Sequence, residues 1–138
     1  MNAADLLDKA ERALASARLL LGSGDVDGAC NRTYYAMFDA ARSALLSTRS
    51  AAITESARTH SGLIGAFSLH LVKSGLVPVE FGKALNRVAE IRIVADYTDN
   101  QVDAGTAGRA VDQAERFVAE IRRRFPPSTV AASKDADD

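Results

Sequence analysis

The apolar residues of this chain recur with the period of an α-helix along most of its length. From Asn2 onward they return every three or four positions, with charged residues on the opposite side. The same spacing continues further along, so the sequence predicts helices over residues 2–22, 25–48, 59–75, 78–97 and 103–125. We find no useful length of strand-like alternation between apolar and polar residues. The pattern therefore predicts an all-α protein.

Residues with strong capping preferences stand at the predicted helix ends. Asn2 and Asp5 have the spacing of a capping box, in which each side chain accepts a hydrogen bond from the other residue's backbone N–H. The other expected boundary residues are Asp25, Thr59 and Asp103 as N-caps, Gly75 as a helix end and Pro78 as a helix start. These signals agree with the apolar period and set the expected helix limits.

Two stretches lack the helical pattern. Residues 49–57 are small and polar, which indicates a loop, and residues 126–138 have too little hydrophobic mass to order, which predicts a disordered tail. One helical domain is then expected over residues 1–125. Because short turns make neighbouring helices antiparallel, we expect an up-and-down four-helix bundle with the shorter helix over residues 59–75 as a fifth, additional helix.

The length and net charge of the chain limit the kinds of function that it can have. The chain has 138 residues, close to the size of one domain. Its 17 Lys and Arg residues nearly balance 18 Asp and Glu residues, giving a net charge of −1, so no overall positive charge drives nucleic-acid binding. Any anion-binding site must be local. Arg outnumbers Lys by 13 to 4, and the planar guanidinium suits fixed contacts with phosphates and carboxylates.

The cysteine and histidine content argues against a metal or disulfide framework. Cys30 is the single cysteine, and with His60 and His70 it cannot complete a Cys/His zinc site. We expect no metal and no cofactor. Charged residues interrupt the N-terminal apolar residues, which excludes a signal-peptide core or a membrane span there, so a cytoplasmic protein is expected.

Three sequence blocks resemble the HEPN family in order and spacing. They are ACNRTYYAMFDAARSALL over residues 29–46, RTHSGLIGAFSLHLVKSG over residues 58–75 and RIVADY over residues 92–97. The resemblance implies an all-helical, HEPN-like bundle that usually forms homodimers. It also implies an RNA- or nucleotide-associated toxin of a toxin–antitoxin pair, with a nucleotidyltransferase as the possible antitoxin partner.

The resemblance implies a site at the end of the fourth predicted helix. Many HEPN proteins are metal-independent ribonucleases in which an Arg is followed a few residues later by a His, at the dimer cleft. Arg92 matches that Arg, but the following residues IVADYTDNQ contain no His. Ribonuclease activity is therefore left open. The candidate catalytic residues are Arg92, Asp96 and Tyr97, together with His60 if the start of the third helix reaches the same cleft.

The chemistry of RNA cleavage explains this choice. Attack by a ribose 2′-hydroxyl needs a base, an acid for the leaving oxygen, and a cation for the phosphate. Arg92 can supply the cation, whereas Asp96, with an ordinary pKa of about 3.9, is a weak base. His60 is better suited to moving protons. The candidate ligand-binding residues are Arg92, Tyr34, Tyr35, Arg32 and Arg58.

Simpler interpretations stay open at this point. Arg92 and Asp96 are four residues apart, so they could form an ordinary surface ion pair. Tyr34 and Tyr35 could serve the core or an interface. The protein could be a non-catalytic module that docks a nucleotidyltransferase, with Tyr97 as the residue that this partner modifies. It could also be a helical bundle without a ligand.

Overall fold

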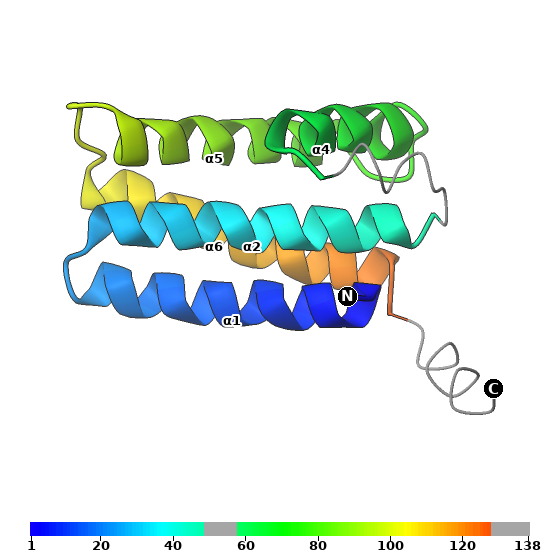
Figure 1. The fold of residues 1–138 in the computed structure, drawn as a ribbon, viewed down its shortest axis with the longest axis horizontal. Helices are drawn as coiled ribbons and strands as arrows, with labels where there is room; N and C mark the ends of the chain where they lie inside the picture. Colours follow the sequence, from blue (N-terminus) through cyan, green and yellow to red (C-terminus); the bar gives the residue numbers. More distant parts are fainter. Residues whose placement is uncertain (49–57, 128–138) are drawn as a thin grey trace.

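Helices form the described part of the chain. In this computed structural model, which describes residues 1–48 and 58–127, the elements are α1 (Ala3–Gly22), α2 (Val26–Leu46), α4 (His60–Phe67) with the π-helical turn η1 (Ser68–Val72), α5 (Val79–Tyr97) and α6 (Ala104–Arg124). Consecutive long helices run in opposite directions (Figure 1). The predicted all-α, up-and-down bundle is confirmed. The predicted loop over residues 49–57 and most of the predicted tail, residues 128–138, lie outside the described residues.

The helices begin at the positions that the capping residues of the sequence indicate. Asn2 Oδ1 accepts the Asp5 N–H at 2.8 Å and Asp5 Oδ2 accepts the Asn2 N–H at 3.0 Å, which completes the capping box. Three more side chains accept an N–H three residues ahead of themselves and so start α2, α4 and α6; they are Asp25, Thr59 and Asp103. Pro78 precedes α5 and fixes its first turn.

The third helix differs from its prediction at its C-terminal end. Instead of one continuous α-helix, it ends in η1, where the Lys73 N–H donates to the Ser68 carbonyl at 2.9 Å. The apolar pattern gave no sign of this wider turn, because Leu63, Phe67 and Leu71 keep a four-residue spacing and are all buried. Gly75 then reverses the chain with a φ of 82°, in the left-handed region that favours glycine.

Helix α2 is the centre of the bundle. It packs on α1, α5 and α6 along its length and on α4 near its C-terminal half (Figure 1). Its buried residues include five alanines, whose small side chains let neighbouring helices approach on several sides. Two buried hydroxyl groups of α2 have backbone acceptors. Thr33 Oγ1 donates to the Ala29 carbonyl of the same helix at 2.7 Å, and Ser43 Oγ donates to the Ala3 carbonyl at the start of α1 at 2.9 Å.

Helix α5 is held mainly against α2. Leu85 and Val88 of α5 enter the core, and α5 touches α6 only sparsely. Helices α1 and α6 are linked by surface ion pairs in addition to apolar packing, since Arg18 bonds Asp112 at 2.6 Å and Arg122 bonds Glu11 at 2.7 Å. One face of α5 therefore packs on α2, and another face borders a groove beside α6.

Removing a core side chain of α5 should destabilise the bundle, whereas the same truncation on the surface should not. Leu85 is fully buried and Leu69 is 55% exposed. We expect Leu85→Ala to lower the free energy of unfolding by about 2–5 kcal/mol through lost burial and a residual cavity. Leu69→Ala should change it by less than about 0.5 kcal/mol. Urea unfolding followed by circular dichroism measures both, and equal effects would contradict this packing.

Candidate functional site

The guanidinium of Arg92 lies close to three tyrosine rings. Its side chain projects from α5 toward α2, and the residue is only 8% exposed. The guanidinium carbon lies 4.7 Å from the ring centre of Tyr34, 5.5 Å from that of Tyr97 and 5.9 Å from that of Tyr35. The ion pair between Arg92 and Asp96 is present, at 3.6 Å, but it is largely buried and not on the surface. Cation–π attraction to the rings favours this placement of its charge.

The hydrogen bonding of Arg92 is incomplete. Its Nε atom is buried and has no hydrogen-bond partner, although its Nη1 lies 3.6 Å from Asp96 Oδ2. That carboxylate oxygen also accepts a hydrogen bond of 3.0 Å from Asn31 Nδ2 on α2. Asp96 is therefore anchored to α2, while a donor of Arg92 still lacks an acceptor. An unsatisfied buried donor is energetically costly, so the position of Arg92 needs an explanation beyond packing.

His60 reaches the same group of residues from the start of α4. Its Nδ1 atom lies 2.6 Å from the Tyr34 hydroxyl oxygen. Its ring stacks on Tyr34 with 5.4 Å between ring centres and also contacts Phe38 at 5.1 Å. Because Thr59 caps α4, His60 occupies the first helical position and remains exposed to solvent. The predicted approach of His60 to the surroundings of Arg92 is thus seen in the structure.

We call Arg92, Tyr34, Tyr35, Tyr97 and His60 the Arg92 cluster. Burial raises the pKa of Tyr34 to about 12, against the opposing effect of the nearby Arg92 charge, so this phenol stays protonated at neutral pH. Burial and, next, the Arg92 charge lower the pKa of His60. His60 is therefore neutral at pH 7. When its Nδ1–H donates to the Tyr34 oxygen, Nε2 is free to accept a proton.

The remaining predicted ligand-binding residues lie around the cluster. Arg32 sits with its guanidinium carbon 5.5 Å from the Tyr35 ring centre, and its Nε is also buried without a hydrogen-bond partner. Arg58 is exposed, two residues before His60. Sequence reasoning missed Asn31, whose amide holds Asp96. The available signal was its place four residues before Tyr35, on the same face of α2.

Neither a metal-binding cluster nor a membrane-spanning helix is present in the described ranges. Within residues 1–48 and 58–127, no group of three or more His, Cys, Asp and Glu side chains is arranged to hold a metal ion. No helix in these ranges combines the length and apolarity needed to cross a bilayer. Cys30 is buried, and burial, then the charges of Asp27 and Asp96, raise its pKa to about 11, so its thiol is not an activated nucleophile.

Comparison with known proteins places the chain in a family. A profile of the HEPN domain matches residues 3–124, nearly all of the helical part. The chain therefore belongs to the HEPN family, an all-α class, as its fold and its RIVADY segment suggest.

Three relatives from different organisms match between 64% and 86% of this chain. A UPF0332 protein of Gloeobacter violaceus is 35% identical over 125 residues, covering 84% of this chain and 95% of its own length. A protein of Methanocaldococcus jannaschii named "putative toxin" is 30% identical over 118 residues, covering 86% of this chain and 84% of its own. A UPF0332 protein of Thermotoga maritima is 39% identical over 89 residues, covering 64% of each chain.

The lowered pKa of His60 predicts a loss of stability in mild acid. Between the folded-state pKa and the ordinary value of 6.5, the unfolded chain binds more protons than the folded chain, so stability falls as pH drops through this window. We expect the urea midpoint of the wild type to fall between pH 7.5 and pH 5.5, and His60→Gln to reduce that fall. His70→Gln is the matched control and should keep the wild-type fall. An unreduced fall in His60→Gln would refute the link.

Proposed function

We propose that this HEPN protein is of the toxin type and binds RNA at the Arg92 cluster. The observation that carries the proposal is the nearly buried guanidinium of Arg92, held among three tyrosine rings, with an unpaired Nε. Two relatives from Methanocaldococcus jannaschii bear the name "putative toxin", which supports the toxin assignment.

A phosphate of RNA suits the chemistry of this cluster. A guanidinium offers several donors in one plane, and a phosphate oxygen can accept from two of them. Tyr97 is 71% exposed and Tyr35 is half-buried, so their rings can stack on bases that are not paired. Arg32 beside Tyr35 adds a second positive charge for the same backbone.

A second copy of this chain would complete the binding cleft. Ile93 is 47% exposed and Tyr97 is 71% exposed, and both lie on α5 within about one and a half turns of Arg92. Exposed apolar side chains beside a buried charge favour an interface at this face. We propose that two copies meet here, so that RNA lies between two Arg92 clusters.

The cluster also has groups that fit RNA cleavage. In this reaction, Nε2 of His60 takes the proton of a ribose 2′-hydroxyl, and the 2′-oxygen forms a bond to phosphorus. The bond from phosphorus to the 5′-oxygen breaks, and that oxygen gains a proton from solvent. Arg92 would stabilise the charge that develops on the phosphate oxygens. Here His60 replaces the His that the RIVADY segment lacks, and Tyr34 orients its ring through Nδ1.

Changing Arg92 should weaken RNA binding. We expect Arg92→Ala to reduce the affinity for a mixed single-stranded RNA pool by about tenfold or more, since bonds to charged groups contribute about 1.5–3 kcal/mol. Arg92→Lys keeps the charge but loses the planar donors, so it should bind at an intermediate level. Fluorescence anisotropy measures the binding.

The matched control removes an arginine elsewhere. Arg12 is exposed on α1, so Arg12→Gln should bind RNA nearly as the wild type does. Helical circular dichroism should be unchanged in all three variants. Normal RNA binding by well-folded Arg92 variants would remove Arg92 from the site. Cleavage of the pool by wild type, but not by His60→Gln, would assign His60 to the reaction.

The exposure of Tyr97 favours a second candidate function. In this alternative, the protein is a non-catalytic module that docks a nucleotidyltransferase, which transfers a nucleotidyl group to Tyr97. The phenol oxygen would attack the α-phosphate of a nucleoside triphosphate held by the partner, and pyrophosphate and the phenol proton would leave. Arg92, at 5.5 Å from the Tyr97 ring centre, would attract the incoming phosphates.

Mass spectrometry tests Tyr97 as the acceptor. Trypsin should release residues 93–109, in which Tyr97 is the single tyrosine. After co-expression with a nucleotidyltransferase encoded beside this protein, we expect this peptide to gain the mass of one or more nucleotidyl groups. Tyr97→Phe should abolish the gain, and Tyr35→Phe should keep it. An unmodified peptide in the presence of an active partner would refute the acceptor role.

A further inference from the structure

A groove runs along the outer edges of α5 and α6, because both helices pack chiefly on α2 and only sparsely on each other. Two neighbouring cavities form this groove, with volumes of about 330 and 460 Å³, and Gln113 and Arg116 of α6 line both. From there the smaller cavity extends toward the end of α6, to Glu120, and the larger one extends toward its start, to Thr106. The groove therefore has a direction along α6, with a different lining at each end.

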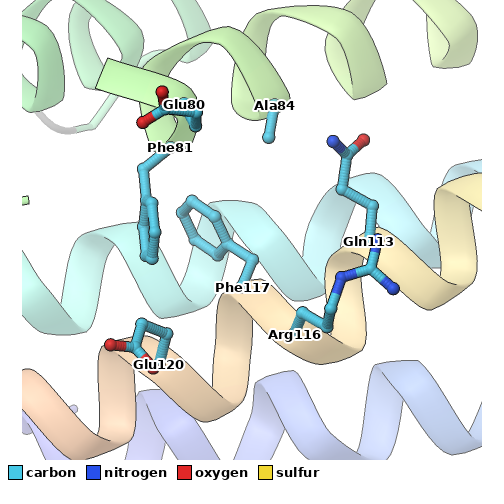
Figure 2. A pocket seen from close by; sticks show the side chains of 7 residues that line it. All are labelled: Glu80, Phe81, Ala84, Gln113, Arg116, Phe117 and Glu120. Atoms are coloured by element: carbon cyan, nitrogen blue, oxygen red, sulfur yellow. The ribbon is translucent and has the colours of Figure 1, made fainter. Parts of the chain in front are cut away.

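The smaller cavity has an apolar floor. Figure 2 shows Phe81 of α5 beside Phe117 of α6, and Ala84 lies about one turn farther along α5. The two ring centres are 5.4 Å apart, and Phe117 is only 3% exposed, so the rings form a surface without a projecting anchor. Small apolar side chains can cover such a surface and remove it from water. We call Phe81, Ala84 and Phe117 the apolar floor.

Three arginines line the larger cavity. Arg87 comes from α5, while Arg109 and Arg116 come from α6, and all three are exposed. Among the described residues, none of the three forms an ion pair. Asp112 lines the same cavity, but its carboxylate is bonded to Arg18 of α1 at 2.6 Å. Because like charges repel one another, negative groups placed between these three groove arginines would be stabilising.

The chain itself continues with a segment of matching composition. Residues 128–138 follow α6 and have the sequence STVAASKDADD. The first half of this segment carries the small apolar residues Val130, Ala131 and Ala132, and the second half carries three aspartates and one lysine. Traced back from the end of α6, the groove presents first the apolar floor and then the groove arginines. Apolar groups followed by negative charge is the order that this groove requires.

The length of the segment suits the length of the groove. At about 1.5 Å per helical residue, Arg116 lies about 14 Å and Arg109 about 24 Å along α6 from Phe125. An extended chain spans at most about 3.3 Å per residue, so Asp135 can lie up to about 33 Å from Phe125. The difference of about 9 Å leaves room to reverse the direction of the chain. The aspartates can therefore reach all of the groove arginines.

Attachment to α6 makes weak contacts sufficient for binding. An exposed ion pair taken alone contributes little to stability, because water and salt screen its charges. A segment joined to its site by a short linker, however, is present there at an effective concentration on the order of millimolar. Several weak contacts can then hold it in place. Because these contacts are electrostatic and exposed, added salt must weaken them.

We propose that the groove is a binding site for an acidic peptide and that its occupant is residues 128–138 of the same chain. In this arrangement Val130 and the two alanines after it cover the apolar floor, and the three aspartates lie among the groove arginines. The segment runs antiparallel to α6 and joins its outer edge to that of α5. The groove shares no residue with the Arg92 cluster, so this proposal does not depend on RNA binding there.

Paramagnetic broadening of amide signals in the full chain tests the proposal. A nitroxide label is attached to the new thiol of an Ala136→Cys variant, between two of the aspartates. Cys30 is buried, and this burial raises its pKa to about 11, so the native thiol stays unlabelled. We expect the label to broaden the signals of residues 106–116 of α6 more strongly than those of residues 15–22 of α1.

Residues 15–22 of α1 are the internal control. They lie beside residues 106–116, since Arg18 bonds Asp112 across the two helices. Both stretches are therefore at a similar distance from the end of α6, and a segment free in solvent would broaden both alike. An excess at residues 106–116 thus reports binding in the groove.

Further variants of the labelled chain test the role of charge. Changing the three aspartates to asparagines should remove the excess broadening, and added salt should reduce it. Arg87→Gln combined with Arg116→Gln should lower the ratio of bound to free segment about fivefold, because exposed ion pairs are individually weak. Arg12→Gln removes an exposed arginine of α1 and should leave the excess unchanged. Helical circular dichroism and the urea midpoint show that each variant is folded.

Three results would overturn the proposal. Equal broadening of residues 15–22 and 106–116 would show that the segment does not bind the groove. An excess that survives both high salt and the change of the aspartates to asparagines would show that the groove arginines do not hold it. The third result comes from a mixture of spin-labelled chains with isotope-enriched chains that carry no label. Broadening of residues 106–116 in this mixture would make a second copy the source of the segment.

Discussion

The burial of α2 on several sides is the constraint on which this structure depends. A helix covered by α1, α4, α5 and α6 must present small or apolar residues in most directions, and its alanines meet that requirement. The polar and aromatic residues that α2 does carry are then forced into contact with its neighbours. Tyr34 and Asn31 meet α5 in this way, and through them α2 determines where Arg92 and Asp96 can lie.

The same packing explains why a charged side chain is stable near the core. Burying an unpaired guanidinium in an apolar surrounding is costly, but here aromatic faces and one carboxylate compensate part of that cost. The Nε atom of Arg92 still has no hydrogen-bond partner, so part of the cost of burial remains. A bundle built for stability alone would have an apolar residue at this position, so the arrangement is better explained by function than by folding.

The fold was predictable because its signals are local. The caps at Asn2 and Asp103 and the three-to-four-residue apolar spacing act within one or two helical turns, and the structure follows them. The π-helical turn η1 was not predictable, since its apolar residues keep the spacing of an α-helix. The family resemblance named Arg92, but no local pattern showed that its side chain would be buried.

The composition of the site could be predicted only in part. Arg92 and Asp96 are neighbours on one helix. In contrast, Tyr34 contacts His60, which is 26 residues away in the sequence, and Asn31 contacts Asp96, which is 65 residues away. These contacts depend on how the helices pack against each other, and no local sequence pattern determines that packing.

Helix α5 has one further consequence for this protein. This helix bears the Arg92 cluster on its α2 side and has few direct contacts with α6. Its position is therefore determined mainly by the α2 interface, which also provides Asn31 and Tyr34. Any substitution that loosened this one interface would expose the Arg92 guanidinium to water as well as weaken the bundle.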